Sequence, residues 1–108
     1  MACAYLIFYR VQAEDPAAFV AYYRDHHLPL VRQFPKILSV EFHVADDEEA
    51  PFLIVVRLVF ANRHDLEVAL RSPERLSAHA DMKRFPAYEG DVLRQIVRIE
   101  PASEAMTT

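Results

Sequence analysis

Residues 22–30 have the sequence Tyr22-Tyr23-Arg24-Asp25-His26-His27-Leu28-Pro29-Leu30, inside a longer segment with the pattern of an amphipathic helix. Two adjacent histidines and a proline are unusual in such a segment. Proline removes a backbone donor, and its ring clashes with the carbonyl four residues back, here that of Asp25, at a cost of about 3 kcal/mol. A helix break directly after two imidazole groups indicates a functional site.

The segment before this stretch has a clear helix start. Asp15-Pro16 is typical of an N-cap followed by proline at the first helical position. We expect the helix to reach about Phe34 and to end before Pro35. At about 100° per residue, His26 and His27 lie on the two flanks of one apolar stripe. That stripe consists of Phe19, Tyr23, Leu30 and Phe34.

The rest of the chain contains four candidate strands and a second helix. The second strand alternates, with Val40, Phe42 and Val44 on one face, and the third is almost continuously apolar, as in a central strand. Asn62 is the expected cap of the second helix, which restarts or kinks at Ser72-Pro73 and continues to about Arg84. The predicted strands are Ala4 to Arg10, Ile37 to Ala45, Pro51 to Phe60 and Asp91 to Glu100.

This β-α-β-β-α-β order predicts the ferredoxin-like fold of the α+β class: a four-stranded antiparallel sheet with two helices on one face. We expect one domain over residues 1–100 and a flexible tail over 101–108. The other sheet face has no cover within the chain, although Leu53, Val55 and Val59 lie there. A second copy packed sheet to sheet, giving a homodimer, is the simplest cover.

Composition excludes several classes of function. The 108-residue chain is 53% hydrophobic, so it is globular, and its formal net charge of −4 argues against nucleic-acid or membrane-surface partners. Cys3 stands alone, which excludes a disulfide framework. Gly90 is the single glycine, which excludes a glycine-rich phosphate loop. We find no leader and no bilayer-spanning run, and therefore expect a soluble cytoplasmic protein.

His27 is the first candidate for catalysis, because histidine exchanges protons near neutral pH. The competing interpretation is a structural histidine that hydrogen bonds to a carbonyl freed at the Pro29 kink. His26 points to the other flank, where it is solvated or interfacial, and it is a weaker candidate for contact with a ligand. Since adjacent helical side chains diverge, the pair is a poor metal site, and we expect neither a metal nor another cofactor.

Other polar and aromatic residues are weaker candidates for binding a small-molecule ligand. Tyr9 on the first strand and Tyr23 on the helix suit a small aromatic or polyketide-like ligand, although they suit an ordinary core equally well. His43 and Glu41 are either an acid/base pair or a polar patch at the dimer contact. Arg57 interrupts an apolar strand and needs a partner, for which Glu41 is suitable if both face away from the helices.

Three segments together resemble the EthD family of the dimeric α/β-barrel superfamily. His27-Leu28-Pro29-Leu30 is similar to the family's His-x-Pro-Leu stretch, and Ser72-Pro73-Glu74 to its second-helix pattern. Ala80-Asp81 and Phe85 continue that pattern. The glycine common after the proline at position 35 is replaced by Lys36, which affects the turn and not the histidine.

The resemblance implies a homodimer with facing sheets, but not one chemistry. EthD proteins are named for a role that accompanies ether degradation, and the superfamily includes isomerases, cyclases, metal-free monooxygenases and haem-binding proteins. In several of these the ligand lies between helices and sheet. We therefore keep three hypotheses: a cofactor-free enzyme acting on a hydrophobic oxygenated molecule, a non-catalytic accessory or carrier protein, and a haem-binding monooxygenase relative. For the first, His27 is the acid/base, and Asp81 and Phe85 join the ligand site.

Overall fold

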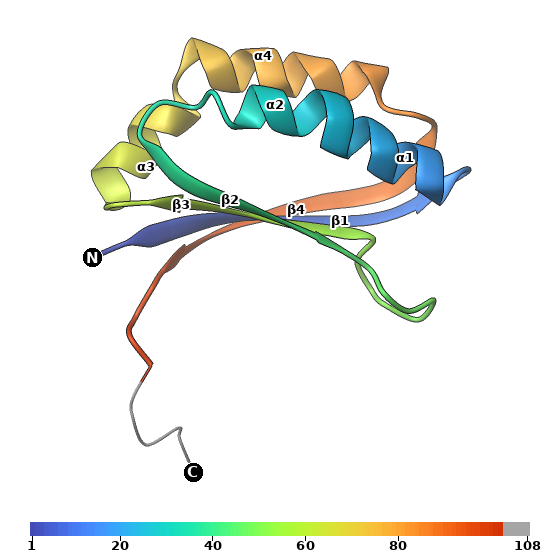
Figure 1. Cartoon of the computed structure of the whole chain (residues 1–108), viewed down its shortest axis with the longest axis horizontal. Helices are drawn as coiled ribbons and strands as arrows, with labels where there is room; N and C mark the ends of the chain where they lie inside the picture. The colour runs from blue at the N-terminus through green and yellow to red at the C-terminus, as the bar shows by residue number, and fades with distance from the viewer. Residues whose placement is uncertain (103–108) are drawn as a thin grey trace.

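A computed structural model describes residues 1–102 of the chain. Four antiparallel strands form one sheet in the order β2-β3-β1-β4 (Figure 1), which confirms the ferredoxin-like arrangement. The part of the predicted tail beyond residue 102 lies outside the described residues. The strands are β1 (Cys3–Ala13), β2 (Ile37–Val44), β3 (Ile54–Phe60) and β4 (Tyr88–Arg98).

β3 begins at Ile54 rather than Pro51, and β4 stops at Arg98 rather than Glu100. β1 ends later and β4 begins earlier than predicted, because these two strands pair with each other. β1 continues to Ala13 and β4 begins at Tyr88, and these two residues are opposite one another in the ladder. Gly90 lies in this added part of β4 at φ 114°, where a Cβ atom would collide with the carbonyl of Arg10. The single glycine therefore permits a close approach of two strands.

The first helical segment is continuous rather than broken at Pro29. It consists of α1 (Pro16–Tyr22), the π-helical turn η1 (Tyr23–His27) and α2 (Leu28–Val31). The Asp15 carboxylate caps it by accepting a hydrogen bond from the N–H of Ala18 at 3.1 Å, as predicted. In the wide turn the N–H of Leu28 donates to the carbonyl of Tyr23, five residues back. A π-helical turn contains one residue more than an α-helical turn, so it inserts an extra residue into the helix.

The wide turn changes which side chains face the sheet. The predicted stripe placed Leu30 in the core, but Leu30 is only half-buried, whereas Val31 is buried. Four buried positions follow one another at intervals of four residues, since one extra residue in the wide turn rotates the following helix. They are Phe19, Tyr23, His27 and Val31, and Leu28 and Phe34 are buried beside them.

The second helical segment agrees with its predicted boundaries. It consists of α3 (Arg63–Leu70), α4 (Pro73–Asp81) and the 3-10 turn η2 (Met82–Arg84). The side chain of Asn62 caps α3, and that of Ser72 caps α4 by accepting from the N–H of Arg75. The predicted restart at Ser72-Pro73 is therefore a boundary between two helices.

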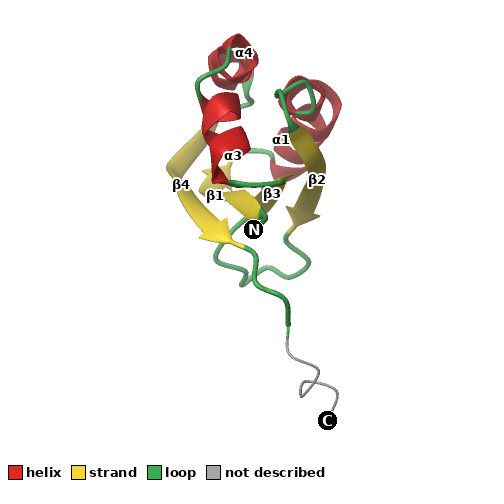
Figure 2. Cartoon of the chain, turned by 90° about the vertical axis from the view of Figure 1, so that its left-hand side faces the viewer, coloured by secondary structure: helices red, strands yellow, loops and turns green. Residues whose placement is uncertain are grey.

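The helices cover only one face of the sheet, as Figure 2 shows end-on. Core residues Ile54, Val56 and Leu58 of β3 face the helices and are fully buried. Val55 and Val59 of β3 face the other way and are half-buried, together with Phe8 of β1. No helix of the described residues is long and apolar enough to cross a membrane.

A candidate active site between the helices and the sheet

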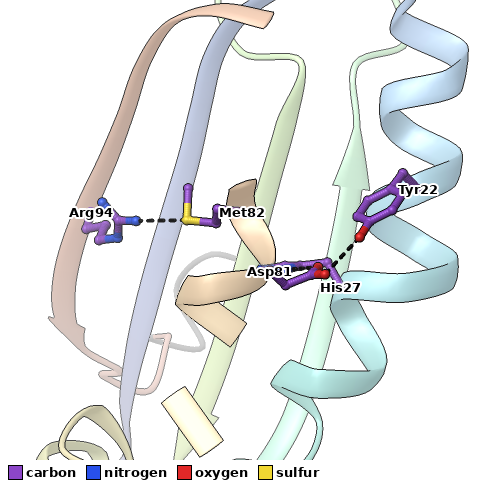
Figure 3. A network of polar contacts seen from close by, with 5 residues as sticks. All are labelled: Tyr22, His27, Asp81, Met82 and Arg94. Atoms are coloured by element: carbon purple, nitrogen blue, oxygen red, sulfur yellow. Dashed lines mark hydrogen bonds and ion pairs between the residues drawn. The ribbon is translucent and has the colours of Figure 1, made fainter. Parts of the chain in front are cut away.

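A buried polar network joins the two helical segments (Figure 3). Nδ1 of His27 lies 3.0 Å from Oδ2 of Asp81, and the hydroxyl of Tyr22 donates to Oδ1 of the same carboxylate at 2.8 Å. His27 and Asp81 are only 4% and 8% exposed. A carboxylate can only accept, so we assign the imidazole proton to Nδ1. The other ring nitrogen, Nε2, has no hydrogen-bond partner among residues 1–102 and retains its lone pair.

Burial determines the protonation of this network. Desolvation lowers the pKa of His27, and the hydrogen bond and negative charge of Asp81 oppose that effect without reversing it. The imidazole is therefore neutral at neutral pH. Burial and the hydrogen bond to Asp81 both raise the pKa of Tyr22. The two groups that contact the carboxylate are thus a neutral imidazole and a protonated phenol, so Nε2 of His27 can accept a proton.

Aromatic rings hold the imidazole in place. The His27 ring centroid lies 4.7 Å from that of Tyr23 and 4.8 Å from that of Phe85, which meets it edge-on. Tyr23 in turn stacks on Phe42 of β2. Phe85, at the end of η2, contacts six aromatic rings in all: Tyr9, Phe19, Tyr22, Tyr23, His27 and Tyr88.

A small cavity lies beside this cluster, between the helices and strands β1 and β4. Its volume is about 40 Å³, and His27, Tyr9 and Arg94 are among the residues that line it. That volume has room for only a few water molecules. A larger molecule would require the helices or the η2 turn to move away from the sheet.

Two buried tyrosines lie next to the cavity. Burial raises the pKa of Tyr9 to about 12 and that of Tyr23 well above its usual value, so both stay protonated. Their ring centroids are 5.1 Å apart. The Tyr23 hydroxyl is buried close to the Tyr9 phenol, and no hydrogen bond of good geometry joins it to another group within the described part of the chain. An unpaired buried hydroxyl is rare and costs about 1–3 kcal/mol.

The structure does not bring all of the sequence candidates together. Tyr9, Tyr23, Asp81 and Phe85 surround His27. His26 instead is exposed, and its ring lies tilted against that of Tyr22 with the centroids 4.8 Å apart.

His43 lies on the opposite face of the sheet. Its Nε2 atom is 3.0 Å from Oε1 of Glu41, and Arg57 donates to Oε2 of the same carboxylate at 2.7 Å. The pairing of Arg57 with Glu41 is therefore confirmed. His43 and Arg57 both lower the pKa of Glu41. No group of three metal-ligating side chains occurs among residues 1–102.

A second, larger hollow of about 900 Å³ lies at the far end of β1. It is open, and its wall contains neither a histidine nor a tyrosine. Five carboxylates line it with one cation, Arg10. The acidic residues are Asp46, Asp47, Glu48, Glu89 and Asp91. We place the candidate site in the smaller cavity, since a group able to exchange protons lies there.

The sequence candidates did not include Tyr22 or Arg94. Regular α-helical geometry places residues 22 and 27 about 140° apart, so their shared carboxylate depends on the wide turn. Arg94 could have been found, because it lies on the same strand face as Val92 and Ile96 and interrupts an apolar pattern. Its Nη2 donates to Sδ of Met82 at 3.9 Å (Figure 3).

Comparison with known proteins shows the family of this chain. The model of the EthD domain matches residues 12–87, which include both halves of the His27–Asp81 pair. The chain belongs to the EthD domain family. A curated relative, an uncharacterised 11.0 kDa protein of Rhodococcus erythropolis from the thcB-thcC intergenic region, is 34% identical over 74 residues. That match covers 66% of this chain and 72% of the relative.

Solved structures with the same fold include another EthD family protein. That protein, from Bacillus halodurans, has a TM-score of 0.76 at 20% identity and covers 93% of this chain and 100% of its own. SnoaB of Streptomyces nogalater, a cofactor-independent oxygenase, has a TM-score of 0.64 at 12% identity, over 95% and 97% of the two chains. Other matches are described as dimeric ferredoxin-like proteins or as monooxygenases. At these identities the structures show the fold alone.

Proposed function

We propose that this EthD-domain protein is a cofactor-free enzyme that moves a proton on a hydrophobic, oxygenated small molecule. His27 is the acid/base. The observation that carries the proposal is the buried pair in which Nδ1 of His27 lies 3.0 Å from Oδ2 of Asp81 while the ring lines a cavity. A neutral imidazole with one nitrogen fixed and the other free is the arrangement that general base catalysis needs.

The reaction is an isomerisation, a cyclisation or a related step. Nε2 of His27 takes a proton from a carbon next to a carbonyl group, the electron pair of the C–H bond forms a C=C bond, and the π pair of the carbonyl group moves to its oxygen. Tyr9 and Tyr23 remain protonated and donate hydrogen bonds to that oxygen as it gains charge. Return of the proton from Nε2 to another atom completes the step. Asp81 holds the imidazole tautomer and does not itself transfer the proton.

The second candidate function is a non-catalytic small-molecule carrier, which the aliphatic and aromatic part of the lining of the 40 Å³ cavity favours. A carrier needs only apolar surface and a few polar contacts, and can enclose its ligand completely. In that case His27 has a structural role only, as the hydrogen-bond donor to the carboxylate of Asp81. The related fold of the cofactor-independent oxygenase SnoaB supports the enzyme, since that protein works without a cofactor on the same scaffold.

We also propose that two copies pack through the open sheet face. Several proteins of this fold are described as dimeric. The open face has half-buried apolar side chains, including Phe8, Val55 and Val59, and the 40% exposed Leu93. Burial of such surface contributes about 25 cal/mol per Å², so a second copy of the same face is a suitable cover.

The test of the enzyme is hydrogen exchange on carbon. A panel of hydrophobic ketones and lactones is incubated in heavy water with the protein, and deuterium incorporation is followed by NMR. We expect at least one compound to exchange faster with the wild-type protein than without it, and the His27→Gln variant to lose that acceleration. Binding without any accelerated exchange would favour the carrier. Acceleration that persists in His27→Gln would exclude His27 as the base.

A further inference from the structure

We infer that the molecule bound beside His27 carries a carboxylate, and that Arg94 and Arg75 recognise it. This inference rests on the proposed site and adds the chemical class of its ligand. Both arginines line the same cavity as His27 and Tyr9.

Arg94 is an exposed residue that also lines the cavity. It lies opposite Ile7 in the ladder between β1 and β4, on the sheet face below the helices. Its guanidinium donates to Sδ of Met82 at 3.9 Å, and a thioether is a weak acceptor. No carboxylate pairs with it among residues 1–102. Its positive charge nevertheless reaches the buried phenols, since it opposes the rise in pKa of both Tyr9 and Tyr23.

Arg75 adds a second cation from the helical side. It lies on α4, where Nη1 donates to the carbonyl of Leu70 at 3.3 Å, and it also has no ion pair in the described part of the chain. His79, one turn further along α4, lines the same wall. The cavity is thus bordered by cationic or protonatable groups from β4, α4 and η1.

No acidic side chain lines this cavity, although the chain as a whole is acidic. Asp81 lies behind His27, and both of its oxygens are engaged, one by Tyr22 and one by the imidazole. The five carboxylates of the larger hollow are at the far end of β1. The charges are therefore segregated, and a positive wall in a negative protein attracts an anion.

A carboxylate fits this wall better than other anions. Guanidinium groups bind carboxylates through paired, charge-assisted hydrogen bonds. A carboxylate would replace the weak sulfur acceptor of Met82, while its apolar body would contact Ile7, Val31 and Phe34. A ligand with one carboxylate group and an otherwise apolar surface suits a cavity whose remaining wall is aromatic and aliphatic.

The test compares two probes of equal shape and different charge: para-trifluoromethyl benzoate and para-trifluoromethyl benzamide. Dissociation constants are measured by fluorine NMR with the wild-type protein and the variants Arg94→Gln, Arg94→Lys and Arg75→Gln. Arg32→Gln is the matched control, because Arg32 is exposed, does not line the cavity and changes the net charge equally. Thermal melts of each variant verify that it is folded.

We expect the wild-type protein to bind the benzoate about tenfold to a hundredfold more tightly than the benzamide. This ratio corresponds to the contribution of one charge-assisted hydrogen bond. Arg94→Gln should lose most of this preference and Arg75→Gln part of it. Arg94→Lys should retain some preference, and Arg32→Gln all of it. Equal affinity for the two probes, no binding of either at its solubility limit, or equal effects of Arg94→Gln and Arg32→Gln would overturn the inference.

These outcomes are separable from those of the proposed reaction. His27→Gln should keep the preference for benzoate, since the imidazole is not the anion's partner. A missing preference together with His27-dependent exchange would overturn the carboxylate inference and leave the acid/base role intact. A retained preference with exchange that does not depend on His27 would overturn the acid/base role alone.

Discussion

Nδ1 of His27 and Oδ2 of Asp81 lie 3.0 Å apart although 54 positions separate the two residues in the chain. The contact joins the π-helical turn to the last residue of α4. It therefore links the two helices above the sheet and also fixes the one free imidazole nitrogen beside the cavity. Any substitution in this pair therefore affects both the stability of the protein and the proposed reaction, so the free energy of unfolding and the reaction rate must both be measured.

We predict that His27→Gln keeps the fold but loses the proposed reaction. The glutamine amide can still donate to Asp81, so the free energy of unfolding in urea should fall by no more than about 0.5–1.5 kcal/mol, the net worth of one hydrogen bond. Removal of an acid/base group should slow turnover by about 10²–10⁴-fold. His26→Gln is the control, since His26 is exposed and does not line the cavity. A His27→Gln variant that is destabilised but reacts normally would leave the histidine with a structural role only.

Asp81→Asn and Tyr22→Phe should differ in their effects on turnover. An asparagine amide can donate to Nδ1, which moves the imidazole proton to Nε2 and removes the base, so we expect a loss of about 10²–10⁴-fold. Tyr22→Phe leaves the carboxylate and the tautomer in place and should cost less than about tenfold. Steady-state rates over a pH series distinguish the two. Equal losses in both variants would show that Asp81 does not act through the tautomer of His27.

The stability of the protein should depend on pH through His27. Burial lowers the pKa of His27 in the folded state below its ordinary value of 6.5, so the unfolded chain binds this proton more readily. The neutral imidazole contributes its full stability above the unfolded-state pKa. That contribution is lost as the pH falls through 6.5 towards the lower folded-state pKa. Urea titrations of the wild-type protein should therefore show a decline in this window that is smaller in His27→Gln, and parallel curves for the two proteins would contradict it.

The open sheet face gives a prediction about assembly. Sedimentation equilibrium at micromolar concentration should report a mass of twice the 12.5 kDa chain. Val55→Asp places a charge on the half-buried open face and should shift the equilibrium towards the monomer. Leu76→Asp is the control, because Leu76 is 67% exposed on α4, away from that face. A wild-type protein that sediments only as a monomer would refute the proposed dimer.

The sequence was sufficient for the fold because its signals are local. Asp15, Asn62 and Ser72 each cap a helix as predicted, and these short-range hydrogen bonds need no knowledge of the rest of the chain. The alternation of β2 and the apolar run of β3 likewise determine which faces are buried. The end of β1 was predicted too early and the start of β4 too late, because both depend on pairing between distant residues.

The site was only partly predictable for the same reason. His27, Asp81 and Phe85 were candidates, but the hydrogen bond between His27 and Asp81 depends on how two helices pack. The π-helical turn is the larger difference: an α-helical periodicity placed His27 at the flank of the stripe and Leu30 within it, whereas His27 is buried and Leu30 only half-buried. A periodicity calculated for one helix type cannot show where the helix widens.

The role proposed for His27 depends on its Nε2 atom being an unprotonated base at neutral pH. Proton–nitrogen correlation NMR on protein with labelled histidine reports the protonation of each ring nitrogen directly. We expect Nδ1 of His27 to carry the proton and Nε2 to be bare at neutral pH, with the second proton binding only below the ordinary histidine pKa of 6.5. A proton on Nε2 at neutral pH, either alone or together with one on Nδ1, would contradict the base that the proposed reaction requires.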